Sequence, residues 1–153
     1  MSTLEFQPPD PDFRSRVRDS FARQGGMIHI GADIVAVEAG RCEIRLPYSE
    51  HVSQQHGFFH GGIVATIADS AAGYAGFSLM PPGAGVLTVE FKINLVAPAD
   101  GDLMIARGSV VRPGRTLTVT RAEVSVEKRG TARVCAVLQQ TLMTITGRPD
   151  VVG

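Results

Sequence analysis

The chain has 153 residues, 44% of them hydrophobic, and its 15 lysines and arginines balance its 15 acidic residues. This length suits one domain with a substantial core, and a net charge of zero argues against a protein that binds nucleic acid through a basic surface. The two cysteines, Cys42 and Cys135, do not form a CxxC motif, so we expect reduced core thiols.

The N-terminal region predicts a loose tail followed by one short helix. A pair of prolines discourages regular structure over residues 1–9. The Asp10-Pro11 pair suits the start of a helix, and Gly25-Gly26 is expected to end it. Between them, apolar residues recur at the spacing of one helical face, at Phe13, Val17 and Phe21. The N-terminus lacks a charged segment followed by an apolar core, so no secretory signal is expected and the predicted location is the cytoplasm.

Two strands are predicted next, over residues 28–38 and 41–47, and an irregular loop over 48–59 follows. The C-terminal half predicts four more strands, which are separated by turns that contain glycine. They cover residues 86–97, 102–112, 115–128 and 131–146. Apolar residues alternate with polar ones along the first of these four, from Leu87 to Leu95. In the third, the apolar phase slips between Val119 and Ala122, which predicts a β-bulge.

Between the two groups of strands lies an apolar run, residues 61–80, made mostly of small residues. It begins with Gly61-Gly62 and stops before Pro81-Pro82-Gly83, which favours a helix. Its length approaches that of a membrane span, but Asp69 within it and the strand that follows favour a helix buried in a soluble protein. A helix that is apolar all round needs cover on most sides. The sequence therefore predicts an α+β fold without a membrane segment, in which a curved antiparallel sheet of about six strands wraps around this helix.

Asp69 is the one ionisable acid or base between His60 and Glu90. A carboxylate in such apolar surroundings is expected to be buried, paired or functional, because an unpaired buried charge is costly. Small residues share the helical face of Asp69; they are Gly62, Thr66, Gly73 and Gly76. Such a track is typical of the floor of a ligand site and equally of close helix–sheet contact, and the spacing leaves both interpretations open.

The glycines at the helix start add a second indication of ligand binding. Free backbone N–H groups and the positive end of the helix dipole favour an anion or a polarised carbonyl. Asp69 lies eight residues after Gly61, or about 12 Å along a helix axis, so one carbonyl carbon cannot contact both groups of the same helix. If both groups serve one reaction, one of them must come from another copy, which predicts a dimer with shared sites.

At these positions the chain resembles a known family. Gln54, His60-Gly61-Gly62 and Asp69, within the run QQHGFFHGGIVATIADSAAGYAG, resemble the hotdog-fold acyl-CoA thioesterases of the PaaI-like and 4-hydroxybenzoyl-CoA thioesterase groups. The resemblance covers about residues 25–146, so we expect an N-terminal tail and short helix over 1–24 and a single hotdog domain over 25–148. It implies a homodimer, often paired into a homotetramer, with two sites at each dimer interface. It also implies hydrolysis of an acyl-CoA or aryl-CoA thioester to the free acid and CoA, with CoA as part of the substrate and no separate cofactor.

The resemblance implies a role for each matched residue. The Gly61 N–H would polarise the thioester carbonyl. Asp69 from the other subunit would attack that carbon as the nucleophile or activate a water as the general base, and the sequence leaves both open. Gln54 would hold the carbonyl or the water, and His60 would order the loop and the helix start. Thr88 falls near a position where some relatives carry a Ser or Thr that orients water.

Two arginines near one predicted turn, Arg112 and Arg115, are expected to bind the phosphates of CoA. Both also suit a solvated turn, so this assignment has a plain structural alternative. The resemblance favours Arg115, because related chains often carry a Gly-Arg pair at this turn.

Other functions were weighed against thioester hydrolysis. His51, His56 and His60 are candidate metal ligands, but Gly57 interrupts any helix that would join them and no cysteine lies nearby, so no metal is expected. A hydratase on the same fold typically uses a catalytic histidine, which residues 61–80 lack. A non-catalytic acyl-CoA sensor usually carries a DNA-binding segment, and the N-terminal 24 residues are too short for one. Thioester hydrolysis is therefore the preferred function, with an acyl-CoA-binding protein and a hydratase as alternatives.

Overall fold

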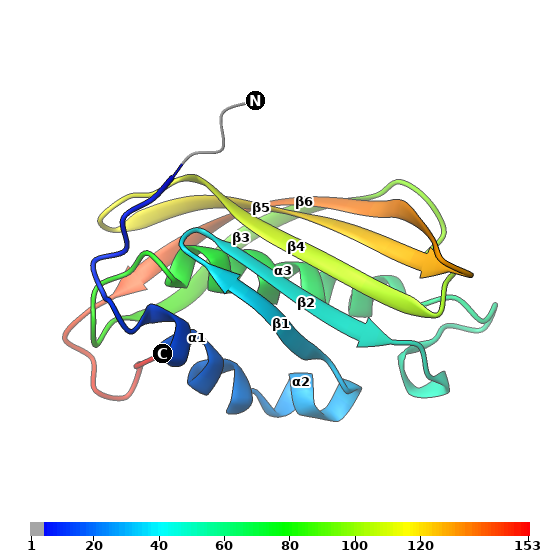
Figure 1. The fold of residues 1–153 in the computed structure, drawn as a ribbon, viewed down its shortest axis with the longest axis horizontal. Helices are drawn as coiled ribbons and strands as arrows, with labels where there is room; N and C mark the ends of the chain where they lie inside the picture. Colours follow the sequence, from blue (N-terminus) through cyan, green and yellow to red (C-terminus); the bar gives the residue numbers. More distant parts are fainter. Residues whose placement is uncertain (1–4) are drawn as a thin grey trace.

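Six antiparallel strands form one sheet that curves over a single central helix (Figure 1). The computed structural model describes residues 5–153, so the first four residues of the predicted tail lie outside the described residues. The helices are α1 (Phe13–Ala22), α2 (Gly25–Ile30) and α3 (Gly61–Phe77), with a short 3-10 helix over Glu50–Val52. The strands are β1 (Asp33–Glu38), β2 (Arg41–Pro47), β3 (Gly85–Leu95), β4 (Leu103–Arg112), β5 (Leu117–Lys128) and β6 (Thr131–Ile145).

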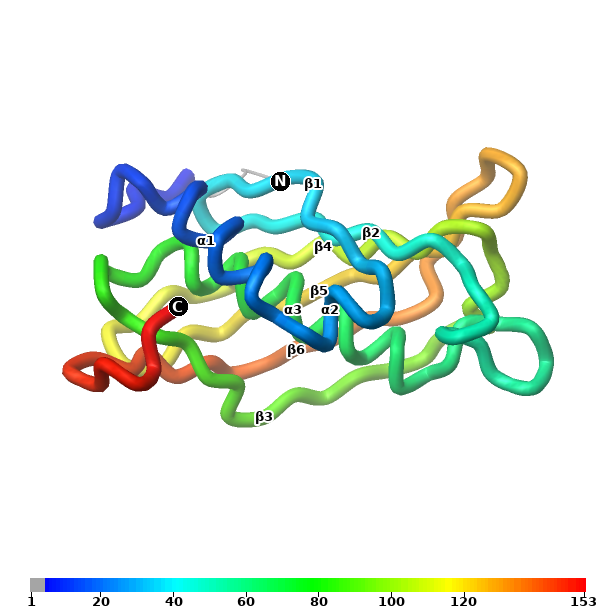
Figure 2. Tube along the Cα trace, turned by 90° about the horizontal axis from the view of Figure 1, so that it is seen from below, coloured from blue at the N-terminus to red at the C-terminus, as the bar shows by residue number. Residues whose placement is uncertain are grey.

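The strands lie across the sheet in the order β1-β2-β4-β5-β6-β3, and each neighbouring pair is antiparallel. The helix α3 packs on one face of this sheet, and β1 and β3 are its two edges (Figures 1 and 2). The arrangement confirms the predicted α+β class and the curved six-stranded sheet around an apolar helix.

The helix α3 lies directly against the sheet because small residues leave little side-chain volume between the two layers. A Cβ atom on Gly108 of β4 would lie 2.1 Å from the backbone oxygen of Ala71, and one on Gly76 would lie 2.3 Å from Leu142 Cδ1. Alanines occupy other contact positions of the helix, and Ala68, Ala71, Ala72 and Ala75 are all fully buried. Close helix–sheet contact is therefore the correct interpretation of the small-residue track at Gly76.

The two N-terminal helices cover α3 on the side away from the sheet (Figure 2). Phe13, Val17 and Phe21 of α1 are buried, as their helical spacing predicts. The Phe21 ring packs edge-on against Tyr74 of α3, with 5.9 Å between the ring centroids. The hydroxyl groups of Ser20 and Tyr74 lie 3.1 Å apart and share a hydrogen bond.

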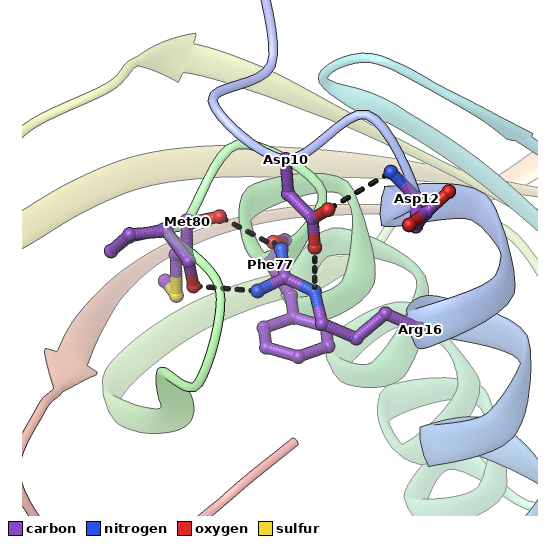
Figure 3. Close-up of polar contacts among 6 residues, drawn as sticks. Asp10, Asp12, Arg16, Phe77 and Met80 are labelled. Atoms are coloured by element: carbon purple, nitrogen blue, oxygen red, sulfur yellow. Dashed lines mark hydrogen bonds and ion pairs between the residues drawn. The ribbon is translucent and has the colours of Figure 1, made fainter.

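A partly buried arginine of α1 holds the C-terminal end of α3 (Figure 3). Arg16 donates to the backbone oxygens of Phe77 at 3.2 Å, Met80 at 2.8 Å and Pro81 at 2.6 Å. Its Nε atom lies 3.1 Å from the carboxylate of Asp10, and its guanidinium stacks over the Phe77 ring at 4.5 Å. Burial lowers the pKa of Arg16, and the charge of Asp10 opposes that effect. The guanidinium thus ties α1 to the last residue of α3 and to the turn after it; the Phe77 and Pro81 carbonyls also accept backbone N–H groups, whereas the Met80 carbonyl has no other partner among residues 5–153.

The structure corrects the prediction for residues 25–38. The first helix ends at Ala22, shortly before Gly25-Gly26 as predicted, but a second and unpredicted helix, α2, begins at Gly25. The strand predicted over 28–38 therefore begins only at Asp33. Gly31, with φ of 80°, ends α2 in the left-handed conformation. Because Met27 of α2 is buried, tertiary packing decides the structure here and overrides the strand-like apolar pattern. The central helix also ends at Phe77 rather than at residue 80.

The bulge predicted between Val119 and Ala122 is wrong. Buried and more exposed side chains alternate in β5 from Leu117 to Val124, and Thr118 and Thr120 are buried at positions that face α3. Threonines at core positions therefore produced the apparent slip in the apolar phase. The irregularity lies opposite, in β4, where Val110 pairs with Thr120 and Arg112 pairs with Val119.

The strand β3 does contain a bulge, which interrupts the alternation predicted from Leu87 to Leu95. Val89 is an extra residue in the pairing of β3 with β6. Thr88 lies opposite Leu142, and Phe91 lies opposite Gln140. Because Leu142 and Gln140 are both fully buried under α3, the bulge lets Thr88 and Phe91 both face the helix.

The two cysteines lie in different strands. Cys42 in β2 and Cys135 in β6 are buried and unpaired, and burial raises their pKa to about 12 and about 11 respectively. Thiols of this kind are inert core groups.

Within residues 5–153, no helix is both long and apolar enough to cross a membrane.

We expect Arg16→Leu to lower the free energy of unfolding by about 2–4 kcal/mol, because it removes three hydrogen bonds from a charged donor and leaves Asp10 without its partner. Arg14→Leu is the matched control on the same helix. It removes one bond to the Val37 carbonyl and should cost about 1 kcal/mol. Urea titrations of both variants would measure the difference, and equal losses would contradict the assigned role of Arg16.

Candidate active site

The carboxylate of Asp69 lies between two hydrogen-bond donors from the sheet. Thr88 of β3 donates its hydroxyl to Asp69 Oδ1 at 2.8 Å. With the Gln140 amide in the orientation that satisfies both of its neighbours, its Nε2 donates to the same Oδ1 at 3.3 Å and its Oε1 accepts from the Gly73 N–H at 3.3 Å. The structure therefore brings together two of the predicted site residues, Asp69 and Thr88, and adds Gln140.

Asp69 has no ion-pair partner among residues 5–153. Burial raises its pKa above the ordinary value, and the hydrogen bonds from Thr88 and Gln140 partly oppose this increase. The sequence left open whether this carboxylate is buried, paired with a cation or functional, and no cation pairs with it among residues 5–153. The carboxylate is half-buried and hydrogen-bonded, which is the usual environment of a carboxylate with a chemical role.

A cavity of about 280 Å³ opens beside this carboxylate. Its walls come from four parts of the chain, the end of α1, the middle of α3, the start of β3 and the C-terminus. They are formed by Ser20, Arg23, Gln24, Asp69, Ser70, Gly73, Tyr74, Gly85, Val86, Thr88 and residues 151–153. Gly73 thus lines a cavity beside Asp69.

The start of α3 has one free backbone donor. His60 is the N-cap, and its Nδ1 accepts from the Gly62 N–H at 2.9 Å, while its carbonyl accepts from Ile63 and Val64. The Gly61 N–H has no acceptor among residues 5–153. His60 therefore caps the helix start, and of the two glycine N–H groups only that of Gly61 has no acceptor among residues 5–153.

Gly61 and Gln54 line a second cavity, of about 480 Å³. Its other walls are mostly apolar and come from the loop before α3, the end of β3 and the segment after it. They are Phe58, Phe59, Val64, Leu95, Val96, Ala97, Pro98, Ala99 and Cys135. The side-chain oxygen of Gln54 accepts from the His56 N–H, so this residue also closes the turn ahead of the helix.

The two cavities are separate in one protomer, and the candidate residues divide between them. Asp69 and Thr88 line the first, whereas Gly61 and Gln54 line the second. This agrees with the sequence argument that the two groups of one helix cannot contact one carbonyl. Both cavities reach the β3 edge of the sheet, the first at Thr88 and the second at Leu95.

Other predicted site residues lie outside these two cavities as far as residues 5–153 show. Arg112 and Arg115 are exposed in and beside the turn between β4 and β5. Thr66 is exposed and donates its hydroxyl to the Gly62 carbonyl at 2.8 Å. Gly62 is exposed, with its N–H bound by His60. The part of the chain that the structure describes contains no cluster of three potential metal ligands.

Gln140 and the walls supplied by both ends of the chain are not among the residues predicted from the sequence. Gln140 had a detectable signal, because it interrupts the inward-facing apolar positions Leu138 and Leu142 of β6. Arg23 and Gln24 had no detectable signal in the sequence, because only the packing of α1 across α3 brings them to the cavity beside Asp69.

Comparison with known proteins identifies the family. Residues 56–133 match the model of the thioesterase superfamily. A thioesterase family protein from Silicibacter pomeroyi superimposes with a TM-score of 0.86 and 48% identity, over 92% of this chain and 99% of that one. The E. coli PaaI protein gives a TM-score of 0.79 at 20% identity, over 89% of this chain and 95% of that one. The 1,4-dihydroxy-2-naphthoyl-CoA hydrolase of Listeria monocytogenes is 29% identical over 98 residues, which are 64% of this chain and 80% of that protein.

The chain therefore belongs to the thioesterase superfamily. This result confirms the predicted hotdog fold, the resemblance to PaaI-like proteins and the class of enzyme, a thioesterase-type hydrolase. The segment that matches the family model contains Gly61, Asp69 and Thr88, and it ends before Gln140.

We expect the carboxyl pKa of Asp69 to lie above that of free aspartate, about 3.9, because burial disfavours the charged form. Thr88→Val should raise it further, because it removes a hydrogen bond to the carboxylate and keeps the side-chain shape. Thr66→Val, which loses a bond to a helix carbonyl, is the control and should leave it unchanged. Carbon-detected NMR titration would measure all three proteins, and a wild-type value at or below about 3.9 would contradict this account.

Proposed function

We propose that the protein hydrolyses an acyl-CoA or aryl-CoA thioester to the free acid and CoA, at sites formed between two copies of the chain. The single observation that supports this most is the division of the reactive groups. An unpaired, hydrogen-bonded carboxylate and a free helix N-terminal N–H lie in separate cavities that both reach one uncovered sheet edge. The activity named for the Listeria relative is consistent with a CoA thioester substrate.

In the proposed site, each group has a distinct chemical task. The Gly61 N–H of one copy donates to the thioester oxygen, where negative charge develops as the carbonyl is attacked. Asp69 of the other copy either attacks the carbonyl carbon, which forms an acyl anhydride and releases the CoA thiolate, or takes a proton from the attacking water. Both routes need an ionised Asp69, so activity should fall as the pH drops through its raised pKa.

The remaining predicted residues have supporting tasks in this proposal. Gln54 lies beside Gly61 and would hold the carbonyl or the water. His60 keeps the helix start in place through its bond to the Gly62 N–H. Thr88 holds Asp69 and lies where it would also reach the water. Arg112 and Arg115 would bind the CoA phosphates from an exposed position.

The edge strand β3 is the surface that we propose joins the two copies. It is 11 residues long and has an unpaired edge, and its large apolar residues are exposed: Leu87 by 51%, Val89 by 56%, Phe91 by 43% and Leu95 by 56%. A long, exposed apolar edge favours pairing with another strand. Antiparallel pairing of β3 with its copy about a two-fold axis near Phe91 would place Thr88 of one copy beside Leu95 of the other. The Asp69 cavity and the Gly61 cavity would then become continuous.

The Gly61 donor can be tested with a matched pair of variants. Gly61→Pro removes the N–H at a first helical position, where proline is favoured, and His60 already has the extended backbone that must precede proline (φ −65°, ψ 136°). Gly61→Ala keeps the N–H and brings a Cβ to the same contact, 3.0 Å from Leu95 Cδ1. We expect Gly61→Pro to lose about 10²- to 10³-fold in kcat relative to Gly61→Ala.

The assay would follow thiol release from a panel of short, long and aromatic CoA esters. Asp69→Ala should lose at least about 100-fold in kcat while it remains folded. If the wild-type protein binds these esters but cleaves none, the non-catalytic alternative replaces hydrolysis.

The sharing of sites between copies can be tested by mixing. Gly61→Pro and Asp69→Ala should each be inactive alone. After subunit exchange, half of the dimers contain one chain of each kind, and one of the two sites in such a dimer is intact, so about a quarter of wild-type activity should return. Sites contained within one chain would recover no activity on mixing. Sedimentation of each variant would show whether the dimer itself had formed.

A further inference from the structure

Gln140 is a polar residue at a position where packing alone would favour leucine. It lies on the inward face of β6 between Leu138 and Leu142 and is 0% exposed. A primary amide buried in an apolar core is destabilising unless both its oxygen and its nitrogen have partners. Its presence here therefore requires an explanation other than filling space.

The two ends of the Gln140 amide contact one turn of α3. The oxygen accepts from the Gly73 N–H and the nitrogen donates to Asp69 Oδ1, each at 3.3 Å. The amide is thus held by the helix backbone and in turn holds the carboxylate.

Thr88 donates to the same oxygen from the other side, at 2.8 Å. Both side-chain donors to this carboxylate therefore bind Oδ1, and Oδ2 receives no hydrogen bond from residues 5–153. We infer that Gln140 is a positioning residue, which together with Thr88 fixes Oδ1 of Asp69 and leaves Oδ2 as the oxygen that attacks the thioester or takes the proton from water. This inference rests on the proposed hydrolysis at Asp69.

The arrangement has two physical consequences. It fixes the side-chain torsions of Asp69, so that Oδ2 keeps one direction relative to the cavity without further ordering during the reaction. It also stabilises the ionised form of a carboxylate that burial would otherwise protonate. A residue that only fills the core would have neither effect.

Three variants separate positioning from packing. Gln140→Leu keeps a buried side chain of the neighbouring type but removes the donor. Gln140→Glu keeps the length of the side chain and replaces the donor by a second carboxyl. Thr120→Val is the matched control, because Thr120 pairs with Gln140 across the sheet, is equally buried and has a hydroxyl without a partner among residues 5–153.

We expect Gln140→Leu to lower kcat by about 10- to 100-fold with a much smaller change in KM. The acidic limb of its kcat–pH profile should move to higher pH, because a donor to the carboxylate is lost. Gln140→Glu should move the same limb further, because a nearby carboxyl disfavours ionisation of Asp69. Thr120→Val should keep the wild-type kcat and pH profile.

Wild-type kcat and an unmoved pH profile in Gln140→Leu would overturn the inference, as would an equal loss in Thr120→Val. NMR titration of Asp69 gives a readout that does not depend on turnover. If the wild-type protein hydrolyses no thioester, the proposed function fails, whereas an upward shift of the Asp69 titration in Gln140→Leu would still support the contact. An unchanged titration would exclude the contact itself.

Discussion

The direct contact between α3 and the sheet determines where the candidate catalytic carboxylate and its hydrogen-bond donors lie. At Gly108 the β4 backbone meets the helix at Ala71, with no room for a Cβ atom, and at Gly76 the helix allows the same close approach to Leu142. Because the helix lies this deep, the carboxylate of Asp69 is level with the side chains of β3 and β6, and short side chains such as Thr88 reach it. A layer of larger side chains would lift the helix and separate Asp69 from its donors.

Glycines weaken α3 from within, and groups outside the helix hold its two ends. Glycine inside a helix costs about 1 kcal/mol relative to alanine, and α3 has glycine at 73 and 76. At the C-terminal end, Arg16 of α1 donates to three carbonyl groups at and just after the end of α3. At the N-terminal end, His60 binds the Gly62 N–H and leaves the Gly61 N–H free. The cap that stabilises the helix therefore also leaves the one donor that a carbonyl ligand needs.

The sequence allowed the elements and the lone acid to be predicted, because these depend on local patterns. Periodicity identified α1 and the six strands, and the absence of other charges singled out Asp69. Errors arose where tertiary packing reversed a local pattern. The two threonines of β5 occupy core positions and imitate a bulge, whereas the true bulge at Val89 is hidden in an unbroken alternation. Gln140 lies 71 residues from Asp69 in the chain, and no local pattern indicates that contact.

The geometry of a rigid helix explains why the proposed site needs two chains. A free N–H at the first turn of α3 and a carboxylate on its third turn point into different cavities, and no change within one chain brings them together. Two antiparallel copies of the helix would do so, and the uncovered β3 edge is the surface proposed to pair them. A two-fold axis then creates two equivalent sites from one contact. In such an assembly the same strand that joins the subunits also carries Thr88, which holds the carboxylate, so correct pairing of the edges and correct orientation of the acid depend on the conformation of one strand. The bulge at Val89 is consistent with this dual role, since Thr88 stays on the helix side of the strand opposite the buried Leu142.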